Sequence, residues 1–241
     1  MNFPLLSKIF KARLEDLPNR KLLINTINAH SFNVARKDSV FFNALQSADI
    51  LLPDGVSVIM AARILLGVKI KKIAGADLFQ YQLRRLNTIG GSCFFLGSSE
   101  LTLQKIYNKA KIEFPNVKVN RYSPPYKTCF SDEDCQRMIE SVNAVKPDVL
   151  FIGMTAPKQE KWAHTHFNEL NAQYICCIGA VFDFYAGNIQ RAPQWIIDIG
   201  LEWLYRLVKE PKRLARRYII GNSKFVLFIL KQKIKQLFEL S

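Results

Sequence analysis

The segment VLFIGMTAPKQE at residues 149–160 shows the pattern that decides the fold of this chain. Its first four residues, 149–152, are all apolar, as expected of a strand that helices cover on both faces of a sheet. A polar turn with a glycine and a proline follows, and residues 160–170 continue as an amphipathic stretch. Strand, polar turn and helix in this order are typical of a parallel α/β sheet.

The same unit recurs along most of the chain. Short apolar runs predict strands at 22–26, 50–52, 93–96, 117–119, 149–152 and 174–178. Amphipathic stretches predict helices at 56–66, 78–86, 101–114, 132–145 and 160–170. This alternation predicts a Rossmann-like, mostly parallel α/β sheet flanked by helices, which we assign to residues 1–195.

The composition excludes several classes of protein. The 241 residues carry 34 Lys and Arg against 20 Asp and Glu, and 49% of them are apolar, too many for a disordered chain. No apolar run reaches 18 residues, and the first residues do not resemble a signal peptide. Five cysteines without a CxxC spacing argue against a disulfide framework or a zinc ribbon. We therefore expect a cytoplasmic protein.

The excess positive charge lies largely at one end of the chain. Residues 201–241 hold ten Lys and Arg against three Glu, which is half of the net charge of +14. Such a segment attracts phosphates of nucleic acids, nucleotides or lipid headgroups. The same part of the chain contains only helical patterns, with expected breaks at Pro211 and Gly221. We therefore predict that residues 196–241 form an all-helical basic appendage.

The last predicted helix has the character of a membrane-surface helix. Lysines occupy one face, at Lys224, Lys231 and Lys235. Another face carries an apolar stripe, composed of Leu227, Leu230, Ile234, Leu237 and Phe238. Basic amphipathic helices with large apolar residues bind anionic membrane surfaces. The alternative is a helix that packs on its own core or on a partner subunit.

The turns after the strands are the candidate site, because ligands of an open parallel sheet bind at the carboxyl ends of its strands. Asp54 closely follows the apolar run 50–52 and precedes Gly55. At this place its carboxyl would be partly desolvated and within reach of a substrate hydroxyl, as a general base requires. The structural alternative is an Asp-Gly turn or an N-cap for the helix that starts near Val56. Asp183 occupies a similar position after the last predicted strand.

Two further turns suit an anion, because each precedes a helix whose free N–H groups and dipole favour negative charge. They are Gly97-Ser98-Ser99 and Thr155-Ala156-Pro157, the second with Lys158 and Gln159 as additional donors. Plain helix capping is the alternative explanation for each turn. Neither turn is a P-loop or a GxGxxG motif, which argues against an ATPase and a classical dinucleotide oxidoreductase.

The histidines show no metal-binding pattern. His164 and His166 are two residues apart and so lie on different faces of a helix, whereas a shared metal favours a spacing of three or four. The sequence offers no Ser-His-Asp arrangement either. We therefore expect no metal site.

Taken together and in this order, these turns resemble the WecG/TagA/CpsF glycosyltransferase family, glycosyltransferase family 26. The resemblance covers roughly residues 20–225, and its motifs are highly specific. They are Thr26-Ile27-Asn28-Ala29, Asp54-Gly55, Ala74-Gly75-Ala76-Asp77-Leu78, Pro157-Lys158-Gln159-Glu160, Phe182-Asp183-Phe184-Tyr185-Ala186-Gly187, Arg191-Ala192-Pro193, Gly200-Leu201-Glu202-Trp203-Leu204-Tyr205-Arg206-Leu207 and Glu210-Pro211-Lys212-Arg213.

The resemblance implies a GT-E fold and a metal-independent, inverting glycosyltransferase without a cofactor. Such enzymes move a hexose or N-acetylhexosamine from a UDP-sugar to a polyprenyl-diphosphate-linked sugar in bacterial cell-surface polysaccharide synthesis. Residues 1–195 would then be the catalytic domain. Residues 196–241 would bind the inner face of the plasma membrane peripherally and complete the active site.

The resemblance also implies roles for individual residues. Asp54 matches the catalytic base, and Thr26 is a catalytic candidate beside it. The expected substrate contacts are Asn28 near the base, Gln159 and Asp183 at the nucleotide-sugar, and Arg206, Arg213 and Arg216 at the diphosphate. Gly97, Pro157 and Lys158 join them as candidates from the two anion-binding turns.

Other interpretations stay open at this stage. The pI of 9.6 alone would suit a nucleic-acid-binding protein, although no such motif appears and we expect no nucleic acid as partner. A non-catalytic UDP-sugar-binding subunit of a polysaccharide assembly complex is a second alternative. A UDP-sugar epimerase would need a nicotinamide fingerprint that this chain lacks. A homo-oligomer in which the appendage closes over a neighbouring subunit is also open.

Overall fold

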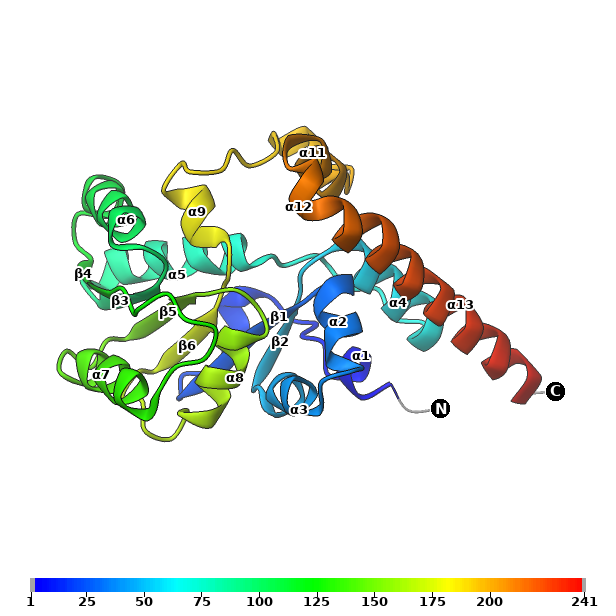
Figure 1. The fold of residues 1–241 in the computed structure, drawn as a ribbon, viewed down its shortest axis with the longest axis horizontal. Helices are drawn as coiled ribbons and strands as arrows, with labels where there is room; N and C mark the ends of the chain where they lie inside the picture. Colours follow the sequence, from blue (N-terminus) through cyan, green and yellow to red (C-terminus); the bar gives the residue numbers. More distant parts are fainter. Residues whose placement is uncertain (1–2, 240–241) are drawn as a thin grey trace.

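The computed structural model describes residues 3–239. Its strands form one six-stranded parallel sheet in the order β2-β1-β6-β5-β3-β4 (Figure 1). The strands are β1 (Leu22–Ile27), β2 (Ile50–Pro53), β3 (Ser92–Gly97), β4 (Lys118–Tyr122), β5 (Val149–Gly153) and β6 (Tyr174–Cys177). All pairings in the sheet are parallel, which confirms the predicted Rossmann-like α/β class.

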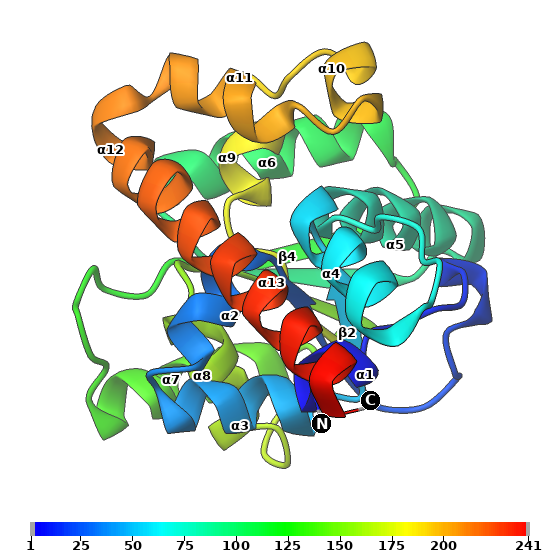
Figure 2. The ribbon, with the colours of Figure 1, turned by 90° about the vertical axis from the view of Figure 1, so that its right-hand side faces the viewer.

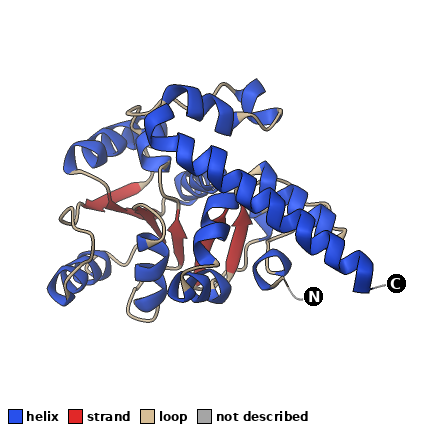
Figure 3. Ribbon diagram, turned by 45° about the vertical axis from the view of Figure 1, so that its right-hand side comes forward, coloured by secondary structure: helices blue, strands red, loops and turns tan. Residues whose placement is uncertain are grey.

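Helices cover both faces of the sheet (Figure 3). Those of the body are α1 (Pro4–Ser7), the 3-10 turn η1 (Leu14–Asp16), α2 (Ala29–Ala35), α3 (Ser39–Ser47), α4 (Val56–Leu66), α5 (Gly75–Ile89), α6 (Glu100–Glu113), α7 (Asp132–Asn143), α8 (Lys158–Thr165) and α9 (Val181–Tyr185). Alternate residues of β1 show the two-sided burial: Leu22 packs with α5, α6 and α9, whereas Leu23 packs with α7 and α8. This explains why the predicted strands are continuous apolar runs.

Five short elements of the body were not predicted: α1, η1, α2, α3 and α9. α2 and α3 are short, and polar residues start both of them. The side-chain oxygen of Asn28 accepts hydrogen bonds from the backbone N–H groups of His30 and Ser31, and Asp38 caps α3 in the same way at Phe41. The helix expected at 160–170 is α8, which starts earlier and ends at Thr165.

The chain after residue 193 is helical, as predicted. It forms α10 (Gln194–Asp198), α11 (Glu202–Lys209), α12 (Pro211–Ala215), the π-helical turn η2 (Arg216–Gly221) and α13 (Asn222–Glu239). The expected break at Pro211 is present, because Glu210, with a φ of −132° and a ψ of 56°, leaves the helical conformation and ends α11. The expected break at Gly221 is wrong. Gly221 keeps a helical conformation at the end of η2, so α12, η2 and α13 form one continuous rod.

This rod packs on the body of its own chain. Figure 2 looks onto α13, which crosses α2 and α4. Phe225 and Ile229 are buried in the same core cluster as residues of α1 to α4, and Phe32 stacks edge-on against Phe225 at 5.1 Å. One face of α13 therefore belongs to the core of the protein.

The predicted apolar stripe of α13 lies on a different face and does not enter that core. Its members Leu227, Leu230, Ile234, Leu237 and Phe238 are between 49% and 78% exposed. The alternative of a helix that packs on its own core therefore holds for the face of α13 with Phe225 and Ile229, whereas the apolar stripe stays exposed. Within residues 3–239, no helix is long and apolar enough to span a bilayer.

Candidate functional site

Asp54 lies at the carboxyl edge of the sheet, where β1 and β2 end side by side. Pro53 pairs with Ile27 in the parallel register, and the N–H of Asp54 donates a 2.9 Å hydrogen bond to the Ile27 carbonyl. Gly55 follows with a φ of +130°, a conformation that side chains rarely adopt. α4 has Gly55 at its N-cap and receives no side-chain cap. The alternative that Asp54 is the N-cap is therefore wrong.

The Asp54 carboxyl is partly accessible and makes no hydrogen bond or ion pair with the described residues. Burial is the main cause that raises its pKa, and Lys72 and Arg217 oppose this rise by stabilising the anion. Glu202 and Asp77 add to the rise. An unpaired carboxyl with a raised pKa at the edge of a sheet suits a general base.

Thr26 and Asn28 lie beside Asp54, as expected from the parallel pairing. Both are partly accessible: Thr26 lies near the end of β1, and Asn28 follows β1 as the N-cap of α2. A Cβ built on Gly55 would lie 3.6 Å from the Cβ of Asn28, so the two turns are in contact. The carbonyl oxygen of the Asn28 amide caps α2, which leaves its NH₂ group without a partner among the described residues.

An ion-pair network connects this edge to the appendage. Lys72 donates a 2.7 Å hydrogen bond to Glu202 at the start of α11, and Arg191 lies 3.3 Å from the other oxygen of the same carboxylate. Arg191 also lies 4.0 Å from Asp77 on α5. Burial would raise the pKa of Glu202, but its bonds to Lys72 and Arg191 hold it below its usual value.

Gln159 occupies a structural position rather than an open one. It is 2% exposed, and its side-chain oxygen accepts from the N–H groups of Met154 (3.3 Å) and Gly179 (3.0 Å). Its NH₂ group donates to the carboxylate of Glu160 at 2.9 Å. Gln159 thereby ties the carboxyl ends of β5 and β6 together.

Pro157 and Lys158, which stand beside Gln159 at the start of α8, also have structural surroundings. Pro157 directly precedes α8 and follows a cis peptide bond. The Lys158 ammonium donates to the Lys127 carbonyl at 2.5 Å and lies 3.4 Å from the centre of the Phe130 ring. In this structure Lys158 therefore points toward the loop at 123–131.

Gly97 is required by close packing at the end of β3. A Cβ at this position would lie 2.7 Å from the Gly153 carbonyl oxygen, and its φ is +112°. Ser99 caps α6 by accepting a hydrogen bond from the N–H of Thr102. The turn predicted at residues 97–99 is therefore present before α6, and the Ser99 hydroxyl already caps that helix.

Asp183 and Arg206 come from opposite sides of the site. Asp183 lies on α9 beyond the end of β6, is partly accessible and accepts a 3.3 Å hydrogen bond from Asn188. Arg206 on α11 lies over the ring of Phe184, the residue after Asp183, with 5.0 Å between the guanidinium carbon and the ring centre. The buried Nε of Arg206 has no hydrogen-bond partner among the described residues. The appendage therefore brings an arginine next to the carboxyl end of β6.

The remaining arginines gather around η2. Arg213 pairs with Glu210 at 2.5 Å, and Arg216 is exposed without a carboxylate partner among the described residues. Arg217, which sequence reasoning counted only as charge, is the arginine that interacts with Asp54. Burial lowers its pKa, and the nearby charges of Arg206 and Arg213 lower it further.

The structure thus brings together Asp54, Thr26 and Asn28 from the body with the arginine cluster of the appendage. Lys72, Glu202 and Arg217 belong to this site and were missed. Glu202 stood within a quoted motif, but nothing in the sequence showed which of the tail residues face Asp54. In residues 3–239, no group of three or more His, Cys, Asp and Glu has an arrangement suited to a metal ion.

Comparison with known proteins agrees with this geometry. The glycosyl transferase WecG/TagA/CpsF family matches residues 5–238. A protein of Bacillus subtilis (strain 168) named N-acetylglucosaminyldiphosphoundecaprenol N-acetyl-beta-D-mannosaminyltransferase is 31% identical over 211 residues, which are 88% of this chain and 80% of that protein. Proteins of the same name from Bacillus spizizenii (29% identical, 89% and 81% covered) and Staphylococcus aureus strain MW2 (25%, 89% and 83%) are also similar. The chain belongs to the WecG/TagA/CpsF family and is a glycosyltransferase.

Proposed function

We propose that this enzyme transfers a hexose or N-acetylhexosamine from a UDP-sugar to a polyprenyl-diphosphate-linked sugar, with inversion and without a metal ion. The relatives' name describes transfer of N-acetylmannosamine to an N-acetylglucosaminyl-diphospho-undecaprenol. This makes UDP-N-acetylmannosamine the first donor to test. Family membership argues against the alternative of a nucleic-acid-binding protein.

The observation that carries the proposal is the unpaired carboxyl of Asp54 facing the arginine cluster. In an inverting transfer, a base removes the proton of the acceptor hydroxyl while the nucleoside diphosphate departs from the other side of the sugar. Asp54 has the accessibility and the raised pKa for the first task. A non-catalytic sugar-binding subunit would have no need for such a group.

The departing diphosphate needs positive charge, which arginines and helix N-termini provide where no metal ion takes part. We assign this task to Arg206, because it lies over Phe184 beside Asp183 and has a buried Nε without a partner. The turn at Gly97 and the N-terminus of α6 lie after β3, which β5 separates from β6 in the sheet, and offer further N–H groups.

The exposed stripe of α13 supports work at a membrane surface. Large apolar side chains and lysines share the exposed part of this helix, a combination that binds anionic bilayers. We propose that the protein associates peripherally with the inner face of the plasma membrane, where a lipid-linked acceptor is accessible. The appendage packs on its own body, which supports a site completed within one chain, and self-association stays a prediction.

The test is a panel of UDP-sugars, each incubated with the full chain and a short-chain prenyl-diphosphate-linked N-acetylglucosamine. Mass spectrometry of the lipid product reports which sugar is added. We expect one added sugar from at least one donor, in buffer that contains a metal chelator. Absence of any lipid-linked product with every donor would overturn the proposal, and product formation only with added divalent metal would overturn its metal-independent part.

A further inference from the structure

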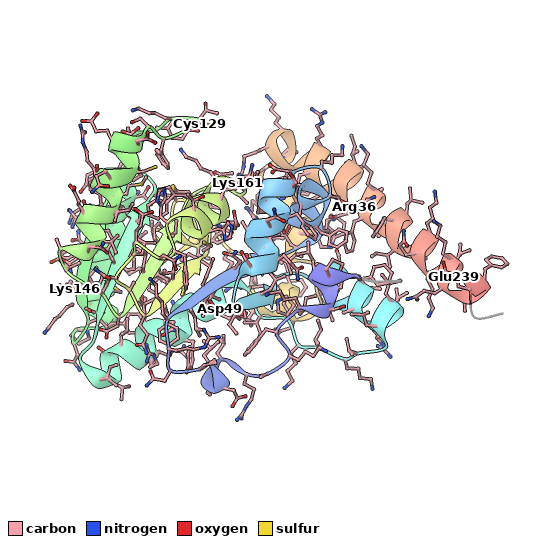
Figure 4. All side chains as sticks on the ribbon, turned by 90° about the horizontal axis from the view of Figure 1, so that it is seen from below. Arg36, Asp49, Cys129, Lys146, Lys161 and Glu239 are labelled. Atoms are coloured by element: carbon pink, nitrogen blue, oxygen red, sulfur yellow. The ribbon has the colours of Figure 1, made fainter. Side chains whose placement is uncertain are left out.

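A second feature of the appendage adjoins the Asp54 site and shares Arg217 with it, on the side where α2 faces α12, η2 and the start of α13. These elements line an open cavity of about 570 Å³, within the range of small-molecule sites. We call it the basic cavity, because its lining includes six cationic side chains: Arg36, Lys37, Arg213, Arg216, Arg217 and Lys224. Figure 4 labels Arg36, which lies where α2 approaches the appendage.

The charge of the basic cavity is not neutralised by protein. Among the described residues, Arg213 is the only one of the six with a carboxylate partner, Glu210. Asp38, the carboxylate in the lining, is already paired with Lys161 at 2.5 Å. Burial, with the charge of Arg217, lowers the pKa of His30 to about 4, so this ring in the lining is neutral at pH 7. Clustered cations of this kind favour a multiply charged anion.

An apolar pocket adjoins the basic cavity. It has a volume of about 150 Å³, and Phe32, Phe42 and Phe228 contribute to its walls together with residues of α1. Arg36 lines both spaces, and its guanidinium lies 3.9 Å from the centre of the Phe228 ring. A ligand that spans both would therefore join an anionic group directly to a hydrocarbon segment.

Arg217 connects the basic cavity to the base. It lines the cavity and also interacts electrostatically with Asp54. In a lipid-linked acceptor the sugar is attached to the diphosphate, so a diphosphate near Arg217 would carry its sugar toward Asp54. The adjoining pocket favours a hydrocarbon over the nucleoside of a UDP-sugar, because Arg36 is the one polar side chain among the described residues of its lining and uracil and ribose need several polar partners.

We propose that the basic cavity binds the diphosphate of the prenyl-linked acceptor, and that the apolar pocket beside Arg36 holds the first prenyl unit. This inference rests on the proposed function and names the acceptor subsite. It assigns Arg216 and Arg217 to the acceptor diphosphate, in place of the donor role that the resemblance implied for Arg216. Arg36 and Lys37 on α2 become binding residues that no sequence motif indicated.

The first test is equilibrium binding to the full chain, with farnesyl diphosphate, inorganic pyrophosphate and UDP as probes. We expect farnesyl diphosphate to bind at least about 10-fold more tightly than pyrophosphate, since burial of a prenyl unit adds apolar contact. Saturating UDP should leave farnesyl diphosphate bound. Equal affinity for pyrophosphate, or complete displacement by UDP, would overturn the assignment.

The second test compares Arg36→Gln with Arg84→Gln, a change of an exposed arginine on α5. Loss of one charged contact should weaken farnesyl diphosphate binding and raise the acceptor KM by about 10- to 100-fold, while UDP-sugar KM changes less than about twofold. Arg84→Gln should match the wild type. Equal thermal unfolding midpoints show that both variants are folded.

The outcomes separate this inference from the proposed function. Transfer activity with an unchanged acceptor KM in Arg36→Gln overturns the acceptor subsite alone. Specific farnesyl diphosphate binding that Arg36→Gln weakens, in a protein that transfers no sugar from any UDP donor, supports the subsite and overturns the proposed reaction.

Discussion

The Asp54 carboxyl lies in a field of two cations and two carboxylates that come from different segments of the chain. Lys72 and Arg217 stabilise its charged form, whereas Glu202 and Asp77 destabilise it. A general base works only when it is deprotonated, so activity falls as the pH drops through its pKa. If Asp54 is the base, as proposed, the surrounding residues set the pH range of the reaction.

Lys72→Met removes one of the two stabilising charges, so the pKa of Asp54 should rise further. The acidic limb of the profile of kcat/KM against pH should move to higher pH, and activity should fall more at pH 6 than at pH 8. Lys71→Met is the matched control, because Lys71 is an exposed neighbour without an ion-pair partner among the described residues. An acidic limb that stays in place in Lys72→Met would contradict the role given to Asp54.

Glu160 is a buried acid outside the reaction. Burial raises its pKa from 4.5 to about 7, despite the hydrogen bond from Gln159. The folded state thus holds the proton more tightly than the unfolded state, and stability is greatest below pH 4.5 and falls as the pH rises toward 7. The shift corresponds to about 3 kcal/mol of the free energy of unfolding.

Glu160→Gln should remove this pH dependence. Urea unfolding between pH 5 and pH 8 should show a smaller decrease in the free energy of unfolding for the variant than for the wild type, by about 2–3 kcal/mol. Glu15→Gln, at an exposed site, should follow the wild type. Parallel curves for Glu160→Gln and the wild type would disprove a proton held by the folded state.

At the level of single residues, the sequence could predict the place of Asp54 at the end of a strand because the pattern is local: an apolar strand, a carboxyl and a glycine stand side by side. Gln159 has an equally specific motif, but its amide is buried where the carboxyl ends of β5 and β6 meet, and only folding brings these two ends together. Arg217 and Lys72 have no motif at all. Their effect on the pKa of Asp54 depends on their distances from its carboxyl in the folded chain, and a sequence pattern does not contain those distances.

Among the elements, α11 depends most visibly on contacts with the body. Its first residue, Glu202, is held by Lys72 and Arg191, and the paired side chains of Lys72 and Glu202 are about 20% exposed. Screening by solvent is therefore weaker here than at an exposed ion pair. This network should keep α11 in place above the carboxyl edge of the sheet.

Glu202→Gln should loosen α11 without unfolding the sheet. We expect the amides of residues 202–209 to exchange hydrogen about 10-fold faster, which corresponds to about 1.4 kcal/mol. The control is Glu133→Gln on α7, where the Arg137 partner and Glu133 are both more than half exposed and the amides should change little. Unchanged exchange in α11 would show that the network does not hold it.

Element prediction from the sequence succeeded for strands and long helices, whose apolar periods extend over many residues. It missed the short elements α1, η1, α2, α3 and α9. Capping by Asn28 and Asp38, rather than a long apolar face, starts α2 and α3. The prediction also placed a helix break at Gly221, where glycine is usually unfavourable. Packing of Phe225 and Ile229 on the body stabilises the continuous rod enough to include that glycine.

At the scale of the whole molecule, the exposed part of α13 presents apolar and basic side chains on the surface. Leu227, Leu230 and Ile234 are 49–65% exposed and were predicted as an apolar stripe before their surroundings were known. Replacement of all three by Ser should lower partitioning onto vesicles with anionic lipids by at least about 100-fold, since each apolar side chain contributes at least about 1 kcal/mol.

The control for vesicle binding is a second triple change at exposed apolar residues elsewhere on the body. Ile89, Leu101 and Ile112 are 60–81% exposed and lie on α5 and α6. Their replacement by Ser should leave partitioning within about twofold of the wild type. Equal loss in both triple variants, or no loss in either, would argue against α13 as the membrane-binding element.

The central claim is that Asp54 is the base of a sugar transfer, and Asp54→Asn tests it most directly. Turnover of a UDP-sugar with a short-chain lipid-diphosphate acceptor should fall by about 100- to 10,000-fold, because asparagine does not accept the hydroxyl proton. The dissociation constant of UDP should change less than about threefold, and Asp132→Asn on α7 should keep full activity. Near wild-type turnover by folded Asp54→Asn protein would contradict the account.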